Sequence, residues 1–247
     1  MKIDASTTLA EAVNAFPHLA REFERRGLDY CCGGLQRLGE ACESIGLNPG
    51  ATVAEVSAVA ALTTSRDPAA WTTMTADVLV DHLETTHHRY LWSELPRVTA
   101  LIDKIVSVHG VLHPELLEVA SCFAYIRADL EPHMLKEERM LFPMIRELVT
   151  STDLPQFHCG TLQNPISVML REHDAVGDLL AQLRQLTNAY APPPDGCASY
   201  IACFSAMAEL EADTHLHIHK ENNVLFPLVT RLEAERANSE GRAPART

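Results

Sequence analysis

The chain has 247 residues and a formal net charge of −13, from 33 acidic and 20 basic residues. Nucleic acids and anionic membranes recruit proteins through basic patches, so this composition argues against both as the main partner. The sequence has no apolar run of about 18 residues and no apolar core of a secretory signal after Met1. Its seven cysteines lack the spacing of a disulfide framework, which suits a reducing compartment. We therefore expect a cytoplasmic protein.

Residues 1–60 are predicted to form a small helical domain, because short apolar patterns alternate there with capping residues. The segment YCCGG at 30–34 stands out. We interpret its glycines as a tight turn that uses backbone angles closed to other residues, and we expect both thiols at a helix start, where amide dipoles lower a thiol pKa. Cys31 and Cys32 are candidates for redox chemistry or metal transfer. A need for small residues beside two glycines explains them equally well.

Polar turn-forming residues gather at 62–73, where we place a linker to a second domain at 74–233. Helical periodicity predicts four long helices, which begin near residues 75, 114, 164 and 198. Connections of this length predict a four-helix bundle, and the chain is predicted to be all-α. Pro96 should kink the first helix, and Pro143 and Pro227 should bend or end the second and the fourth.

The bundle sequence contains a repeated motif. Residues 133–143 and 217–227 both read H-x-x-K-E-x-x-x-L-F-P. The histidine and the glutamate of each copy are four residues apart, so they lie on one face of a helix. Each copy follows, at nearly equal spacing, a predicted helix with its own histidine, His88 or His173. The sequence thus predicts two helical hairpins of the same plan.

The polar residues of this repeat lie on otherwise apolar helix faces, where an unpartnered polar group is costly. Burial in the core explains any single histidine, but a metal site explains the whole set. Four imidazoles and two carboxylates exceed one catalytic zinc site and lack the thiolates of a structural zinc site, whereas bridging carboxylates suit paired iron or manganese. The nitrogen-rich ligation favours iron. The predicted ligands are His88, His133, Glu137, His173, His217 and Glu221. We expect two iron ions with an oxo or hydroxo bridge.

Other polar residues surround the predicted ligands. Three carboxylates are candidates to accept imidazole N–H groups of the ligands, and a solvated helix face explains each of them equally well: Asp129, Glu172 and Asp213. Four further histidines are expected to lie outside the metal site and to face solvent: His82, His87, His215 and His219.

The pattern H…HxxxE…H…HxxxE resembles that of hemerythrin-like domains. The segment 30–34 ahead of it resembles the N-terminal domain of the di-iron proteins that repair iron–sulfur clusters, and residues 164–169, 172–174 and 221–227 are also similar to that family. The resemblance covers about residues 5–230. It implies that the six predicted ligands are those of the family. It also implies that the protein restores iron–sulfur clusters damaged by oxidative or nitrosative stress, with damaged iron–sulfur proteins as partners.

Other functions stay open at this point. Oxygen-carrying hemerythrins have HxxxH on the third ligand helix, where this chain has Gly177 four residues after His173, and the missing fifth histidine makes oxygen carriage the weaker alternative. We keep as alternatives the reduction of nitric oxide at the di-iron centre, which would make the protein an enzyme, and the binding or sensing of oxygen or nitric oxide. The recipient proteins, the electron donor and the oligomeric state are left open.

Overall fold

The computed structural model describes residues 1–61 and 69–240. The chain divides into two compact units: unit 1 is Met1–Leu79 with His215–Thr247, and unit 2 is Val80–Thr214. The described residues form helices and no strand, so the predicted all-α class is confirmed. Among these residues, no helix combines the length and the apolar character needed to cross a membrane. Most of the predicted linker lies outside the described residues, and its end forms the 3-10 helix η1 (Ala70–Thr73).

Four short helices make up the N-terminal part of unit 1: α1 (Leu9–Ala15), α2 (Leu19–Arg26), α3 (Leu38–Ser44) and α4 (Pro49–Ala61). Thr8 and Glu11 form a capping box that fixes the start of α1. Gly27 ends α2 with a left-handed backbone, which a glycine adopts without a steric penalty. Buried residues from these helices, including Leu9 and Phe23, share one apolar core.

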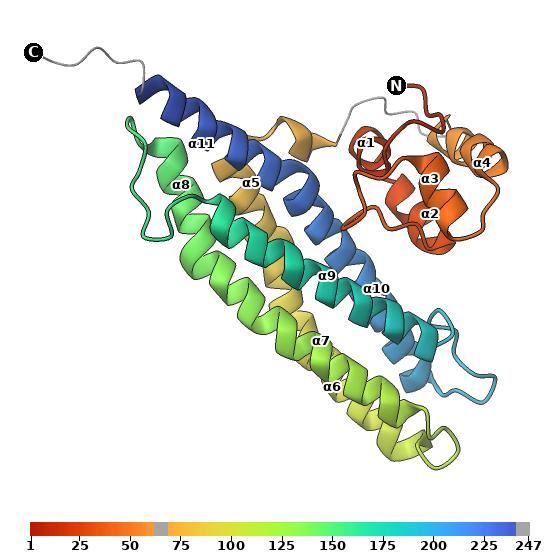
Figure 1. Ribbon diagram of the computed structural model, residues 1–247. Helices are drawn as coiled ribbons and strands as arrows, with labels where there is room; N and C mark the ends of the chain where they lie inside the picture. Colours follow the sequence, from red (N-terminus) through yellow and green to blue (C-terminus); the bar gives the residue numbers. More distant parts are fainter. Residues whose placement is uncertain (62–68, 241–247) are drawn as a thin grey trace, which may run out of the picture. The chain divides into compact units, whose positions relative to one another are not determined.

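Unit 2 contains most of the long helices, which lie side by side as rods in Figure 1. Its elements are η2 (Glu84–His88), α6 (Arg89–His109), α7 (Leu116–Lys136), η3 (Glu137–Leu141), α8 (Phe142–Thr150), α9 (Gln163–Leu186) and the first part of α10 (Ala198–Lys220). Helix α7 packs against α6 and α9. The guanidinium of Arg184 on α9 binds the carboxylate of Glu211 on α10. The predicted four-helix bundle is thus the architecture of the long helices.

The remaining helices are α5 (Ala76–Leu83), which leads into η2, and η4 (Glu221–Leu225) with α11 (Phe226–Glu240), which continue the line of α10 in unit 1. The elements η2, η3 and η4 are π-helical turns inside these long helices. Such turns widen a helix and are frequent at functional sites. Each of the three contains a predicted ligand: η2 ends at His88, η3 begins at Glu137, and η4 begins at Glu221.

Of the two effects expected of Pro143 and Pro227, a bend or an end of the helix, the end is not found. Pro143 and Pro227 do not end their helices, because each is the second residue of a helix, α8 or α11, that starts directly after a π turn. The amide of Phe142, just before Pro143, donates to the carbonyl of Glu137. A proline in a first helical turn needs no amide partner, so the helix continues past it. Helix α6 likewise continues through Pro96.

Candidate metal centre

Unit 2 brings together four of the six predicted ligands, and all four are buried. The Nε2 atoms of His88 and His133 lie 3.4 Å and 3.3 Å from Oε2 of Glu137. The Nε2 atom of His173 lies 3.1 Å from Nε2 of His133. One donor atom each from His133, Glu137 and His173 lies within 4.8 Å of the others, so this group can hold a metal ion. None of the histidines expected outside the site belongs to this described group.

Two further carboxylates orient the imidazoles of this group. Nδ1 of His88 lies 2.9 Å from Oε1 of Glu138, which also accepts from Nε1 of Trp92 at 2.9 Å. Nδ1 of His133 lies 2.9 Å from Oε2 of Glu172. The bond with His133, followed by the ion pair with Lys136, lowers the pKa of Glu172 to about 2. Glu172 therefore carries the charge that favours a proton on Nδ1 of His133.

This orientation supplies a test of whether a metal fits. If Nδ1 of His88 and of His133 carries the proton, Nε2 of each neutral ring presents a lone pair. Both lone pairs then face Oε2 of Glu137 at 3.3–3.4 Å, in a region closed to water. Acceptors that face each other at this distance repel, whereas a cation between them attracts all three. The donor set therefore fits a cationic metal bound by imidazole and carboxylate.

Glu138 was not among the residues predicted from the sequence, although it adjoins the predicted ligand Glu137. Its partner Trp92 follows His88 by one helical turn, so the tryptophan and the histidine share a face. Two features of the sequence could have indicated Glu138. It adjoins a predicted ligand, and Trp92, one turn after His88, has an indole N–H that needs an acceptor. Glu172 was predicted as an acceptor for an imidazole N–H, and the imidazole that it contacts is that of His133.

We expect the substitution Glu172→Gln to lower metal affinity by about 10–100-fold, the range seen when the carboxylate behind a ligating histidine is lost. The amide keeps the shape of the side chain but no longer favours the protonated Nδ1 of His133. Metal competition titrations on the variant and on the parent protein measure the effect. The matched control is Glu131→Gln, because the Glu131 carboxylate accepts from Nε of Arg127 on the same helix and is not a predicted ligand. Equal affinities in all three proteins would mean that Glu172 has no part in metal binding.

The other two predicted ligands lie in unit 1, at the junction of α10 and η4. Nε2 of His217 lies 3.1 Å from Oε1 of Glu221, and both side chains are buried. The spacing of four residues places them on the same helix face, as it places His133 and Glu137 in unit 2. The two copies of the motif thus have the same local geometry.

The structure corrects several expectations about the surrounding residues. Asp129 is exposed, so it is part of a solvated helix face. Asp213 contacts a histidine that is not a predicted ligand: its Oδ1 lies 2.9 Å from Nδ1 of His87. All four histidines expected to face solvent are covered at least in part. His87 and His219 are buried, and His82 and His215 are half-buried, the latter beside the ring of Tyr30. A helix wheel assigns solvent to any face opposite the bundle core, and it cannot show that another segment covers that face.

The expected chemistry of the cysteine turn is also corrected. No helix starts at Cys31 or Cys32, because α3 begins only at Leu38. The contact of Cys31 with the thiol of Cys32, at 3.9 Å between the Sγ atoms, and burial raise the pKa of the Cys31 thiol well above its ordinary value. The carboxylate of Asp29 accepts from the amides of Cys31 and Cys32 and lies 3.2 Å from Sγ of Cys31. The turn therefore disfavours a thiolate at Cys31.

The glycines of this turn are needed for close contacts and not for unusual backbone angles. Neither Gly33 nor Gly34 has a positive φ angle. A Cβ atom on Gly33 would lie 2.9 Å from the carbonyl oxygen of Asp29, and one on Gly34 would lie 2.4 Å from the side chain of Asn223. Any larger residue would push these neighbours away.

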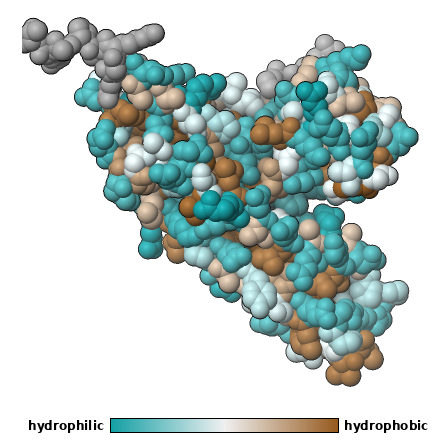
Figure 2. All heavy atoms as spheres, viewed as in Figure 1, coloured by the Kyte–Doolittle hydropathy of each residue, from teal (hydrophilic) through white to brown (hydrophobic). Residues whose placement is uncertain are grey.

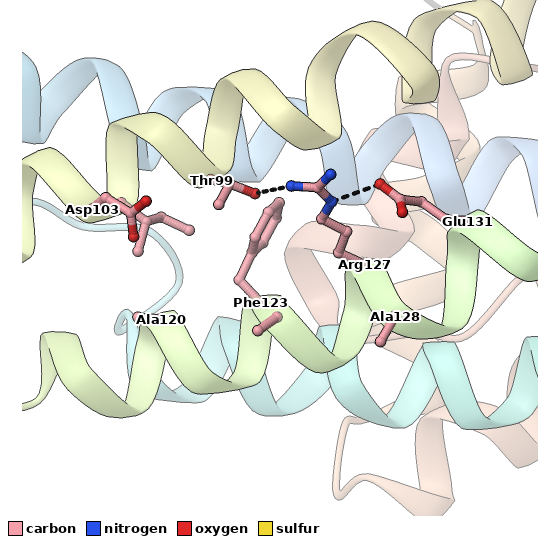
Figure 3. Close-up of a pocket in the computed structure, with 9 residues that line it drawn as sticks. Thr99, Asp103, Ala120, Phe123, Arg127, Ala128 and Glu131 are labelled. Carbon is pink, nitrogen blue, oxygen red and sulfur yellow. Dashed lines mark hydrogen bonds and ion pairs between the residues drawn. The ribbon is translucent and has the colours of Figure 1, made fainter.

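A groove on unit 2 lies apart from the predicted ligands. It has a volume of about 420 Å³ and is lined by residues of α6 and α7, among them Thr99, Phe123 and Arg127. Figure 3 shows Arg127 between Thr99 and Glu131, which it contacts at 3.3 Å and 2.6 Å. None of the lining residues is a predicted ligand. The groove therefore does not mark the metal chemistry.

A second cluster of reactive side chains lies at the end of unit 2 where α6 ends and α10 begins. The exposed thiol of Cys197 directly precedes α10 and lies 3.2 Å from Nε2 of His109. The bond with His109, together with the first amides of α10, lowers the pKa of Cys197 to about 7. The connection between α6 and α7 at the same end exposes Val111 and Leu112. Figure 2 shows a hydrophobic patch at the lower tip of unit 2, where this connection lies in Figure 1.

We expect Cys197 to be alkylated with a half-maximal rate near pH 7, because the thiolate is the nucleophile and its fraction falls as the pH drops below the pKa. The substitution His109→Ala removes the main cause of the shift and should move the midpoint up toward the ordinary cysteine value of about 8.5. Rates of iodoacetamide labelling at the Cys197 peptide, measured by mass spectrometry between pH 5.5 and 9.5, test this. A midpoint that is the same in both proteins would contradict the role of His109.

Comparison with protein families supports the four-helix bundle fold and a cation-binding role for its domain. Residues 59–229 match the family model described as the hemerythrin HHE cation binding domain, and residues 5–60 match a domain of unknown function, DUF542. The first match covers more than half of the chain. The bundle is thus of the hemerythrin cation-binding class, which agrees with the buried imidazole and carboxylate donors of unit 2.

Several relatives resemble the chain over most of its length. The proteins named iron–sulfur cluster repair protein YtfE from Citrobacter koseri and from Escherichia coli O1:K1 are each 32% identical to it over 219 residues. The protein of that name from Enterobacter sp. strain 638 is 33% identical over 219 residues. Each alignment covers 89% of this chain and 94% of the relative. The chain belongs to the family of iron–sulfur cluster repair proteins.

Proposed function

We propose that this protein is a di-iron protein that repairs iron–sulfur clusters damaged by oxidative or nitrosative stress, and that it does so by supplying iron. The buried group of His133, Glu137 and His173 is the observation that carries the proposal, because it combines the nitrogen and oxygen donors that iron accepts. The hemerythrin-type domain and the names of the relatives, which are called iron–sulfur cluster repair proteins, support the same function. The damaged iron–sulfur proteins are the proposed partners.

We propose that the six predicted ligands together hold two iron ions with an oxo or hydroxo bridge. The equal geometry of the two HxxxE motifs supports this count, since each copy presents one imidazole and one carboxylate on a buried helix face. In the sequence, His88 precedes the first copy of the motif and His173 the second, which adds two further imidazoles to the set. Iron bound at such a site would, when reduced, supply ferrous ions to a recipient protein. The chain's own carboxylates, Glu138 and Glu172, hold the imidazole protons at Nδ1.

Iron release should depend on the oxidation state. Ferrous ions carry less charge than ferric ions, so carboxylate and oxo groups hold them less strongly. A ferrous chelator should therefore strip the reduced protein much faster than the oxidised one, and an apo iron–sulfur enzyme should regain activity when it is mixed with the reduced, iron-loaded protein. Equal retention of iron in both states would contradict delivery.

Nitric oxide reduction at the same centre is the second candidate function, because a buried pair of irons with few protein ligands leaves positions open for a small molecule. The two functions differ in a measurable product. Nitrous oxide should accumulate when the reduced protein meets nitric oxide if the centre is catalytic, whereas a delivery protein should lose iron instead. A protein that keeps its iron and yields no product would fit the binding or sensing of nitric oxide or oxygen.

A further inference from the structure

Unit 1 contains a set of contacts between the cysteine turn and the helical turn that follows His217. The amide nitrogen Nδ2 of Asn223, in η4, donates to the carbonyl oxygen of Cys31 at 2.9 Å. The same residue leaves no room for a side chain at position 34, where Gly34 lies against it. The backbone of the turn and the side chain of Asn223 are thus in direct contact across 192 positions of the sequence.

His219 reinforces this contact from the same stretch of helix. Its imidazole is buried, with Nδ1 3.1 Å from the carbonyl oxygen of Tyr30 and Nε2 3.0 Å from Oδ1 of Asn14. The ring of Tyr30 packs on it with centroids 5.5 Å apart. Lys220, the next residue, places its ammonium group 4.6 Å from the ring centre of Trp71. Side chains of α10 and η4 thus hold the N-terminal segment at several points.

The residues that make these contacts alternate along the helix with the predicted ligands. His219 lies between His217 and Glu221, and Asn223 follows Glu221 by two positions. Ligands and contact residues therefore project from one helical stretch, which includes the π turn η4. A change in the backbone of this stretch moves both sets, because a single rigid element carries them.

We propose that Asn223 is a positioning residue that couples the cysteine turn to the ligand-bearing turn, so that metal bound by His217 and Glu221 and modification of the Cys32 thiol disfavour each other. The inference rests on the proposed metal centre. Metal fixes η4, η4 holds the carbonyl of Cys31, and the held turn keeps the half-buried thiol of Cys32 from reacting. By linkage, a modified Cys32 must weaken metal binding by the same factor. Thiol-reactive electrophiles are the class of reagent to which this device responds.

The test compares the rate of iodoacetamide labelling at Cys32 in the apo protein and in the anaerobic, ferrous-loaded protein. In this reaction the Cys32 sulfur forms a bond to carbon, iodide leaves, and the thiol proton passes to the buffer. Mass spectrometry follows the Cys32 peptide, the Cys197 peptide serves as the internal reference, and metal content is measured on each sample. We expect metal to slow labelling of Cys32 by about 5-fold or more, a typical allosteric coupling.

Three variants make the test specific. Asn223→Ala should abolish the metal-dependent difference while iron content stays near that of the parent protein, and Gly34→Ala should do so independently by displacing the Asn223 amide. Asn164→Ala is the matched control, because Asn164 also donates to a cysteine carbonyl, that of Cys159 at 2.7 Å, but lies in unit 2. If the parent protein binds iron and Cys32 is labelled at the same rate with and without it, the coupling is refuted and the metal centre is not. Failure to load iron at all would refute the metal centre and the coupling together.

Discussion

The substitution Glu137→Ala should remove at least half of the bound iron from the purified protein. Glu137 is fully buried, and its Oε2 atom lies within 3.4 Å of two imidazole nitrogens. Without the carboxylate, a bound cation would lose a compensating negative charge in a region closed to water. Iron per chain, measured by elemental analysis on protein whose helical content is unchanged, gives the result.

Asp129→Ala is the matched control for this experiment. Asp129 lies four residues before His133, and Glu137 lies four residues after it. Unlike Glu137, Asp129 is exposed. The control should keep the iron content of the parent protein. If both variants lost the same amount of iron, the assigned ligand face of α7 and η3 would be wrong.

Arg184→Met should destabilise unit 2 by about 2–4 kcal/mol, somewhat below the range for a fully buried ion pair, because the side chain of Arg184 is 31% exposed. Its partner Glu211 is only 1% exposed, so the variant leaves a buried carboxylate without a cation. Burial already raises the pKa of Glu211 in the parent protein. Because this pKa is raised, Glu211 takes up a proton at a higher pH in the folded state than in the unfolded state. Protonation removes the buried charge, so the variant should lose more stability at pH 8, where Glu211 is charged, than at pH 5. Urea unfolding at both pH values measures it.

The surface pair of Arg97 and Glu94 provides the comparison, since the side chain of Arg97 is 49% exposed. Arg97→Met should cost no more than about 1 kcal/mol, as exposed ion pairs do. Adding Glu211→Gln to Arg184→Met should recover part of the lost stability, because it removes the buried charge. A similar loss from both arginines would show that the Arg184 pair gains nothing from its burial.

The sequence predicts those features that follow from the apolar periodicity of a helix or from polar residues on an apolar helix face. The four long helices followed from apolar periodicity, and the burial of His133 and Glu137 followed from their place on an apolar stripe. Glu172, a candidate acceptor because it adjoins the predicted ligand His173, lies against the imidazole of His133. The domain boundaries and the full set of six ligands stay predictions.

Other features depend on contacts between segments that are remote in sequence. His87 and His219 are buried because Asp213 and the segment around Tyr30 cover them, and the helix that carries each residue shows no sign of this cover. The role of Gly34 is explained by Asn223, far along the chain. The π turns could not be predicted from the sequence, because they shift the hydrogen-bond partners of a few backbone amides and leave the apolar period of the helix nearly unchanged.

The central claim is a pair of coupled irons bound by buried histidines and glutamates. The most direct test is the iron content of the purified, iron-loaded protein together with its Mössbauer spectrum. We expect two iron ions per chain, with the spectrum of a coupled ferric pair in the oxidised protein, and a loss of that spectrum in Glu137→Ala. A single uncoupled iron, or a site that accepts only zinc, would contradict the account.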